Sequence, residues 1–169
     1  MSVDAPAYAA RVWDHYAQFF DDPVAQTKLR GPADEPLHVL EYGNVFEGCR
    51  TFTTIGLGLL EGFVEAPHEL FLAATWPGEE LPHLLVATAL ALREHGRPLR
   101  AGMAASGLQP YAPAFAETTG KSAMMFVPPQ ALPPLFSSVG GKPAVEVLMA
   151  VPLSELEYAL LARDGIDAL

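Results

Sequence analysis

Cysteine is almost absent from this chain of 169 residues, because Cys49 is the only one. A single thiol cannot close an internal disulfide, so we expect a reducing setting and a cytoplasmic protein. Basic residues are also scarce: 10 Lys and Arg stand against 20 Asp and Glu, which gives a formal charge of −10. A field of that sign repels nucleic acid and anionic lipid and argues against both as partners. It suits simple solubility or a basic protein partner.

Long hydrophobic runs are missing too. No segment comes near the roughly 20 uncharged residues that a membrane-spanning helix needs. The first residues, Met1 to Asp4, contain neither a basic nor an apolar segment, so we expect no signal peptide. Half of the residues are nevertheless hydrophobic and only 18% are charged, which indicates a folded chain of ordinary domain size.

The sequence also lacks the spacing of known metal and cofactor motifs. None of the five histidines pairs with another at the spacing of metal ligands. His68-Glu69 begins like the helix of a zinc protease, but Leu72 stands where the second histidine is required. The glycines of residues 56–62 and 140–142 do not match a dinucleotide or phosphate-binding loop. We therefore expect no cofactor, no metal and no enzymatic activity.

The elements that the sequence does predict alternate between helix and strand. Helices are expected from Asp4 to about Phe20, from Glu79 to His95, and from a Ser154-x-x-Glu157 capping box to about residue 164. Strands are expected at residues 37–42, 50–55, 68–76, 121–127 and 145–151, with a short one near 103–105. Residues 24–36 are expected to be a loop with at most one helical turn, and residues 102–120 a long surface excursion.

This order predicts a single α+β domain over residues 1–169. We expect a mostly antiparallel or mixed central sheet, covered by about three helices, with the helix at about 4–20 as an N-terminal extension that packs on the sheet. The turn signals before Arg50 predict an antiparallel hairpin between strands 37–42 and 50–55. The threonine-rich strand Arg50 to Ile55 is typical of a half-buried sheet, and the rest of the chain is expected to pair with it or cover it.

Several segments together resemble the Suppressor of fused-like (SUFU) domain family. Val45 to Gly58 resembles the region of that family in which a threonine-rich strand enters a glycine-containing turn. The other matching segments follow in the order of the family: Glu69 to Leu72, Glu79 to His95, Ala123 to Pro129, Val151 to Tyr158 and Gly165 to Leu169. The resemblance covers about Leu37 to Leu169, and it depends on the order and spacing of these segments.

The resemblance implies a protein- or peptide-binding module without enzymatic activity. Animal members of the family have a second lobe and bind a transcription-factor peptide between the lobes, whereas this chain is too short for that lobe, so no residues of that site are transferred. Short single-domain bacterial members look like immunity proteins that neutralise toxins. The acidity of this chain is compatible with a basic toxin domain as the partner.

Two loops are the expected contact regions for a partner, Gly43 to Arg50 and Gly102 to Gly120, because long loops on a rigid scaffold often carry function. The candidate partner-binding residues in them are Asn44, Phe46, Glu47, Arg50, Gln109 and Tyr111. Two alternatives stay open. Cys49 beside Arg50 could serve a small thiol-dependent hydrolase if a histidine lies close to it, and the chain could instead be a homo-oligomeric structural protein.

Overall fold

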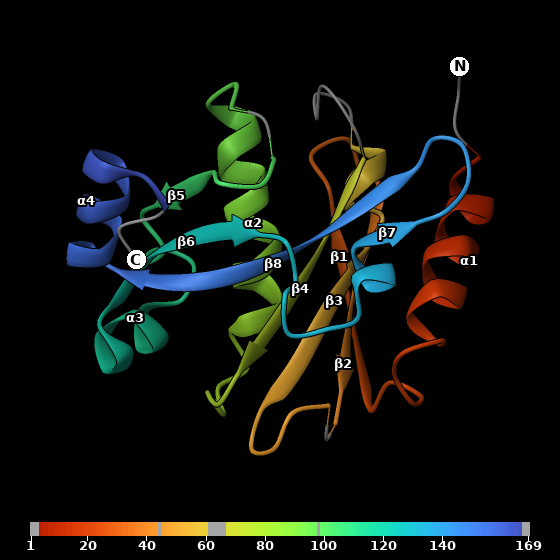
Figure 1. Cartoon of the computed structure of the whole chain (residues 1–169), viewed down its shortest axis with the longest axis horizontal. Helices are drawn as coiled ribbons and strands as arrows, with labels where there is room; N and C mark the ends of the chain where they lie inside the picture. The colour runs from red at the N-terminus through yellow and green to blue at the C-terminus, as the bar shows by residue number, and fades with distance from the viewer. Residues whose placement is uncertain (1–3, 44, 61–66, 98, 167–169) are drawn as a thin grey trace.

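The described part of the chain forms four α-helices and one eight-stranded sheet (Figure 1). The computed structural model describes residues 4–43, 45–60, 67–97 and 99–166. The helices are α1 (Ala5–Tyr16), α2 (Leu81–Glu94), α3 (Pro113–Thr119) and α4 (Glu155–Asp164), with 3-10 helices η1 (Leu57–Leu59) and η2 (Pro134–Ser137). The strands are β1 (Ala25–Arg30), β2 (Pro36–Tyr42), β3 (Arg50–Ile55), β4 (His68–Ala74), β5 (Ala104–Ser106), β6 (Lys121–Val127), β7 (Ser138–Val139) and β8 (Val145–Ser154).

The sheet is mixed, as expected. Its strand order is β1-β2-β3-β4-β8-β6-β5, and β7 pairs with the start of β8. Only β4 and β8 run parallel among the described strands, and the other pairs are antiparallel, including the predicted β2–β3 hairpin. The expected α+β fold with a mixed sheet is therefore confirmed, with one more helix than the three that the sequence indicated.

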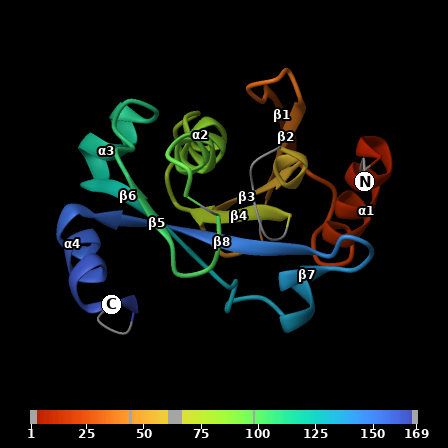
Figure 2. The same ribbon diagram turned by 90° about the horizontal axis from the view of Figure 1, so that it is seen from above.

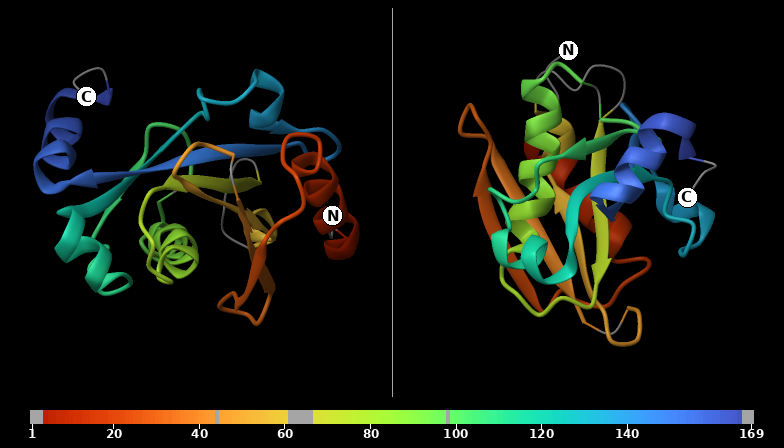
Figure 3. Two further views of the ribbon diagram at one scale, coloured as in Figure 1. Left: turned by 90° about the horizontal axis from the view of Figure 1, so that it is seen from below. Right: turned by 90° about the vertical axis from the view of Figure 1, so that its left-hand side faces the viewer.

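The helices cover both faces of the sheet. Helix α2 lies on one face, and its apolar stripe packs with strand residues such as Phe52, Leu72 and Phe126 in one core cluster. The other face is covered at one end by α1 and η2 and at the other end by α4. Seen from above, α2 and α3 lie together on one side of β8, with η2 and α4 on the other side and α1 beyond the far end (Figure 2). The view from below shows the same layers (Figure 3).

Local sequence patterns, namely an apolar stripe and capping residues, explain why the long helices form. In α2 the predicted stripe is buried, namely Leu81, Leu84, Leu85, Thr88 and Leu92. In α4 both halves of the capping box form, since the Ser154 hydroxyl accepts from the Glu157 amide and the Glu157 side chain accepts from the Ser154 amide. In α1 the Asp4 side chain accepts from the Ala7 amide, but the helix ends at Tyr16 rather than near Phe20.

Three expectations about the elements are wrong. Residues 25–30 form edge strand β1 instead of a loop, because the strand is stabilised by its ladder with β2 while its side chains are largely exposed and carry little hydrophobic signal. Strand β3 is buried on both faces rather than half-buried, because α1 and α2 cover opposite sides of it. The excursion after Gly102 contains helix α3 in addition to strand β5, which lies one residue beyond the predicted place.

Candidate functional site

Arg50 connects the end of the β2–β3 hairpin to the segment between β4 and α2. Its Nε and Nη2 atoms donate to the two carboxylate oxygens of Glu41, at 2.7 and 2.9 Å. Its Nη1 atom donates to the carbonyl oxygens of Pro77 and Gly78, at 3.0 and 2.7 Å. The hydrogen bond to Glu41 raises the pKa of Arg50 above its already high value, so the guanidinium stays charged. Arg50 therefore fixes the position of residues 77–78 beside the hairpin.

Glu80 connects the same segment to α3. Helix α3 begins at Pro113 after Ala112, which has no side-chain group that could accept from the first free amides of the helix. Both carboxylate oxygens of Glu80 take that place, accepting from the amides of Ala114 at 3.3 Å and Phe115 at 2.9 Å. A negative charge at this position is also favoured by the helix dipole. Arg50 and Glu80 together hold the hairpin, residues 77–80 and α3 in one arrangement.

A cleft of about 370 Å³ lies between these elements. Its apolar lining comes from the hairpin, the end of β4, α3 and β8, and consists of Cys49, Ala73, Ala74, Trp76, Phe115 and Pro152. The rings of Trp76 and Phe115 meet edge to face with centroids 5.8 Å apart. The volume falls in the roughly 300–1,000 Å³ range of small-molecule pockets, so the cleft has room for one or two large side chains.

Polar groups at one side of the cleft are Thr75, Thr119 and Lys121. The ammonium group of Lys121 lies 2.8 Å from a carboxylate oxygen of Glu157. That contact and the hydrogen bonds to Ser154 lower the pKa of Glu157 to about 2, so this carboxylate is ionised at neutral pH. Lys121 thus lines the cleft as a cation that already has an anionic partner.

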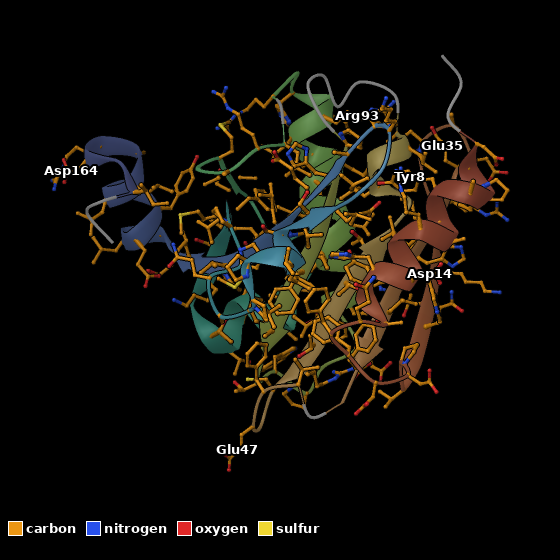
Figure 4. All side chains as sticks on the ribbon, turned by 45° about the vertical axis from the view of Figure 1, so that its right-hand side comes forward. Tyr8, Asp14, Glu35, Glu47, Arg93 and Asp164 are labelled. Carbon is orange, nitrogen blue, oxygen red and sulfur yellow. The ribbon has the colours of Figure 1, made fainter. Side chains whose placement is uncertain are left out.

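The structure separates the predicted contact residues into two groups. Asn44 lies outside the described residues. Glu47 is exposed at the tip of the β2–β3 loop (Figure 4), whereas Phe46 is half-buried and packs against Phe71 with ring centroids 6.1 Å apart. Arg50 is engaged in the contacts given above.

The second group comes from the excursion after Gly102. Gln109 and Tyr111 are exposed on the turn before α3, and 43% of Tyr111 is accessible. Neither is among the residues that line the cleft. The two predicted loops do meet at the cleft, but through Cys49 from one and Phe115 and Thr119 from the other. The role of the six candidate residues in binding stays a prediction.

Comparison with known families decides what kind of domain carries this cleft. A family model described as Suppressor of fused protein (SUFU) matches residues 33–169. The chain belongs to the SUFU family. The SUFU domain is in general a protein-binding module without catalytic activity. Helix α1 and strand β1 precede the matched residues.

One solved structure supports the SUFU fold over nearly the whole chain. It is the 1.40 Å crystal structure of a suppressor of fused protein homologue from Neisseria gonorrhoeae FA 1090. The two share 14% sequence identity and superpose with a TM-score of 0.73, over 96% of this chain and 86% of the other. At that identity the likeness shows a common fold and no more. A comparison with curated proteins finds no match.

Cys49 was the residue on which a thiol enzyme would depend. In this SUFU-family chain it is a free, half-buried cysteine in the lining of the cleft. No histidine is among the nine described residues that line the cleft with it. The described histidines whose side chains make hydrogen bonds do so elsewhere, for example His15 with Phe136 and His68 with Glu146. The arrangement offers Cys49 no imidazole base within the cleft.

The carboxylate of Glu69 forms a second polar site, which was not predicted from the sequence. It is fully buried in β4. It accepts hydrogen bonds from the Tyr8 hydroxyl at 2.7 Å and the Thr54 hydroxyl at 2.6 Å. It also accepts from three successive amides of residues 56–58, at 2.9, 3.3 and 3.2 Å. Burial raises the pKa of Glu69, while these hydrogen bonds oppose the rise. The signal for it in the sequence was a glutamate inside a mostly apolar strand.

The glycines near Glu69 make this arrangement possible. Gly56 has φ +102°, and a Cβ atom there would lie 2.6 Å from the Pro36 carbonyl oxygen. A Cβ atom on Gly58 would collide with the Tyr8 hydroxyl. The Ile55-to-Gly58 exit from β3 is therefore a backbone cradle for a carboxylate of the same chain, and through Tyr8 it fastens α1 to the sheet.

Two further observations limit the chemistry of the described part of the chain. No group of three or more His, Cys, Asp or Glu side chains there is arranged to hold a metal ion. No described helix is both long enough and apolar enough to cross a membrane.

Proposed function

We propose that this SUFU-family chain is an immunity-type binding protein that neutralises a partner toxin. The family fold supports protein binding in general. The proposal adds that the partner is a basic toxin domain, that the chain acts in the cytoplasm, and that residues 1–169 form one SUFU-like domain with α1 as an N-terminal extension. No catalytic step is included.

The observation that supports the proposal best is the cleft between Cys49, Trp76 and Phe115, next to the loop that exposes Glu47. Its walls come from a hairpin and a helix that Arg50 and Glu80 hold in place, so the site is formed before any partner arrives. Preformed sites lose less conformational entropy on binding. The formal charge of −10 would speed association with a basic partner at low ionic strength.

The test uses the genes that neighbour this one in its native genome. Each neighbouring reading frame is expressed alone and together with this chain, and growth of the host is followed. We expect one of them to arrest growth alone and to be tolerated together with this chain. The two purified proteins should then elute as one complex in size-exclusion chromatography with light scattering.

An unrelated acidic protein of similar charge serves as the matched control, because it shows whether charge alone relieves toxicity. If no neighbour is toxic, or if the toxic one forms no complex with this chain, the proposal fails. Light scattering of the chain alone also tests the homo-oligomeric alternative, since a stable oligomer would give a mass that is a multiple of 18.1 kDa.

A further inference from the structure

The cleft has an apolar interior and an acidic surrounding. The chain on either side of its lining residues, in 46–50, 75–80, 113–121 and 152–157, contains six glutamates and two basic residues, of which only Lys121 lines the cleft itself. Both basic residues have carboxylate partners, Arg50 with Glu41 and Lys121 with Glu157. The charge of these segments is thus negative, and neither cation is free to attract an anion.

Four of the glutamates are exposed and are not part of any ion pair among the described residues. They are Glu47 in the hairpin loop, Glu79 before α2, Glu117 on α3 and Glu155 at the start of α4. Each of the four lies within three positions along the chain of a residue that lines the cleft. Exposed carboxylates act over about 8–10 Å at physiological ionic strength, which is enough to attract cations on a segment that crosses the cleft.

The C-terminal end of α2, which lies away from the cleft, is positively charged. Residues 93–100 contain three arginines and one glutamate. Glu47 and Arg93 lie at opposite ends of the molecule (Figure 4). The charge is therefore not spread evenly, and a basic partner would be oriented with its cations toward the cleft end.

We propose that the cleft binds a short segment of a protein partner in which one or two apolar side chains are flanked by Lys or Arg. The apolar side chains enter between Trp76, Phe115 and Ala74, and the flanking cations lie near Glu47 and Glu79. This inference rests on the proposed function, because it names the site and the recognition chemistry of that partner. Contact between an aromatic pocket and an apolar anchor is the usual centre of binding energy in such an interface.

The test is a titration of the ¹⁵N-labelled chain, followed by NMR, with three eight-residue peptides. The first has Lys and Arg around central Leu and Phe, the second replaces its cations with Glu, and the third replaces Leu and Phe with Ser. Only the first should shift the amides of Cys49, Trp76, Phe115 and Thr119 in a saturable way. The second should bind about tenfold more weakly, because repulsion replaces attraction at two or three positions at the edge of the cleft.

Three variants of the chain sharpen the result. Glu47→Lys combined with Glu79→Lys should weaken the first peptide about tenfold, because each reversal replaces attraction by repulsion. Glu94→Lys and Glu35→Lys together make the same change of net charge away from the cleft and should leave affinity within about twofold. Ala74→Leu fills the cleft without changing charge and should abolish saturation, and its own spectrum shows whether the fold is kept.

Several outcomes would overturn the cleft assignment. One is that millimolar concentrations of the first peptide leave the chemical shifts of the cleft amides unchanged. Another is that the second peptide binds as tightly as the first, and a third is that the two double charge variants change the affinity equally. Shifts of the same amides that depend on protein concentration without peptide would place a second copy of the chain in the cleft. If Ala74→Leu still neutralises a toxin, the cleft is wrong while the proposed function stands. If the first peptide binds in the cleft but no neighbouring gene product is neutralised, the cleft assignment stands and the proposed function is wrong.

Discussion

Replacement of Glu69 by glutamine tests whether the buried carboxylate fastens α1 to the sheet. The variant keeps the size of the side chain but turns one acceptor oxygen into an NH₂ group. In the wild-type chain, Oε1 of Glu69 accepts from Tyr8 and two glycine amides, and Oε2 accepts from Thr54 and Leu57. With the amide oxygen at the Oε1 position, the Leu57 amide faces another donor and loses its partner.

The magnitude follows from these contacts. One buried donor without a partner costs about 1–3 kcal/mol, and each of the three bonds kept at the oxygen loses about 1 kcal/mol of charge assistance. Removing a buried charge returns part of that loss, so we expect the free energy of unfolding to fall by about 2–4 kcal/mol. Tyr8→Phe, which removes one donor and leaves the carboxylate with four, should cost about 1.5–3 kcal/mol.

Urea unfolding followed by circular dichroism measures both losses of stability. Their dependence on pH tests in addition whether the pKa of Glu69 is raised or lowered in the folded chain. Burial holds the pKa of Glu69 above its usual value in the folded chain, so the folded state binds this proton more tightly than the unfolded state. The resulting stabilisation is complete below the unfolded carboxyl pKa of about 4.3 and is lost as the pH rises through the folded value. The glutamine variant has no such proton, so its deficit should widen as the pH falls from about 8 to about 5.

A matched control is Glu117→Gln, which makes the same chemical change on an exposed side chain. It should alter the unfolding free energy by less than about 0.5 kcal/mol at either pH. A Glu69→Gln variant as stable as wild type would refute the role of the carboxylate. A deficit that narrows toward acid pH would instead mean that the hydrogen bonds outweigh burial and that the sign of the pKa shift is wrong.

Three more predictions concern the cleft. Arg50→Lys should lower the unfolding free energy in urea by about 1–3 kcal/mol, because lysine cannot hold both oxygens of Glu41 and two carbonyls at once, and unchanged stability would count against the role of the guanidinium. Glu80→Gln should speed hydrogen exchange of the first α3 amides by about tenfold without affecting α2, and equal exchange in the two proteins would remove Glu80 as the cap. Iodoacetamide should modify Cys49 at neutral pH in a single slow phase, as a model thiol does, and a rapid phase would revive the thiol-hydrolase alternative.

The sequence was most informative where one short segment determines its own conformation. The stripe of α2 and the capping box of α4 involve residues within a few positions of one another, and both were predicted. Strand β6 was predicted with its observed bounds. Strand β1 and helix α3 were missed because each depends on a distant partner: β1 on its ladder with β2, and α3 on the carboxylate of Glu80.

The candidate site was predictable only in part, for the same reason. Loop composition located the hairpin and the later excursion, and these two segments do contribute to one cleft. Periodicity could not show that they would meet, since their approach depends on the contact of Arg50 with Gly78 and on that of Glu80 with Phe115, which join segments far apart in the sequence. It also could not show that Arg50, chosen as a contact residue, has its donors directed into the molecule. A lone arginine in a loop looks the same in sequence whether it binds a partner or its own backbone.

The same distinction applies to the acidic charge. A formal charge of −10 suggests a uniformly negative surface, yet several carboxylates are occupied by groups of the chain itself. Glu69 holds the exit from β3, Glu80 caps α3, Glu41 binds Arg50 and Glu157 binds Lys121. Only the other carboxylates are available to a partner. Some of them lie on segments next to the cleft, whereas three arginines lie at the C-terminal end of α2. The net charge therefore says less about binding than its distribution, and the charge variants at the two ends of the molecule separate these two effects.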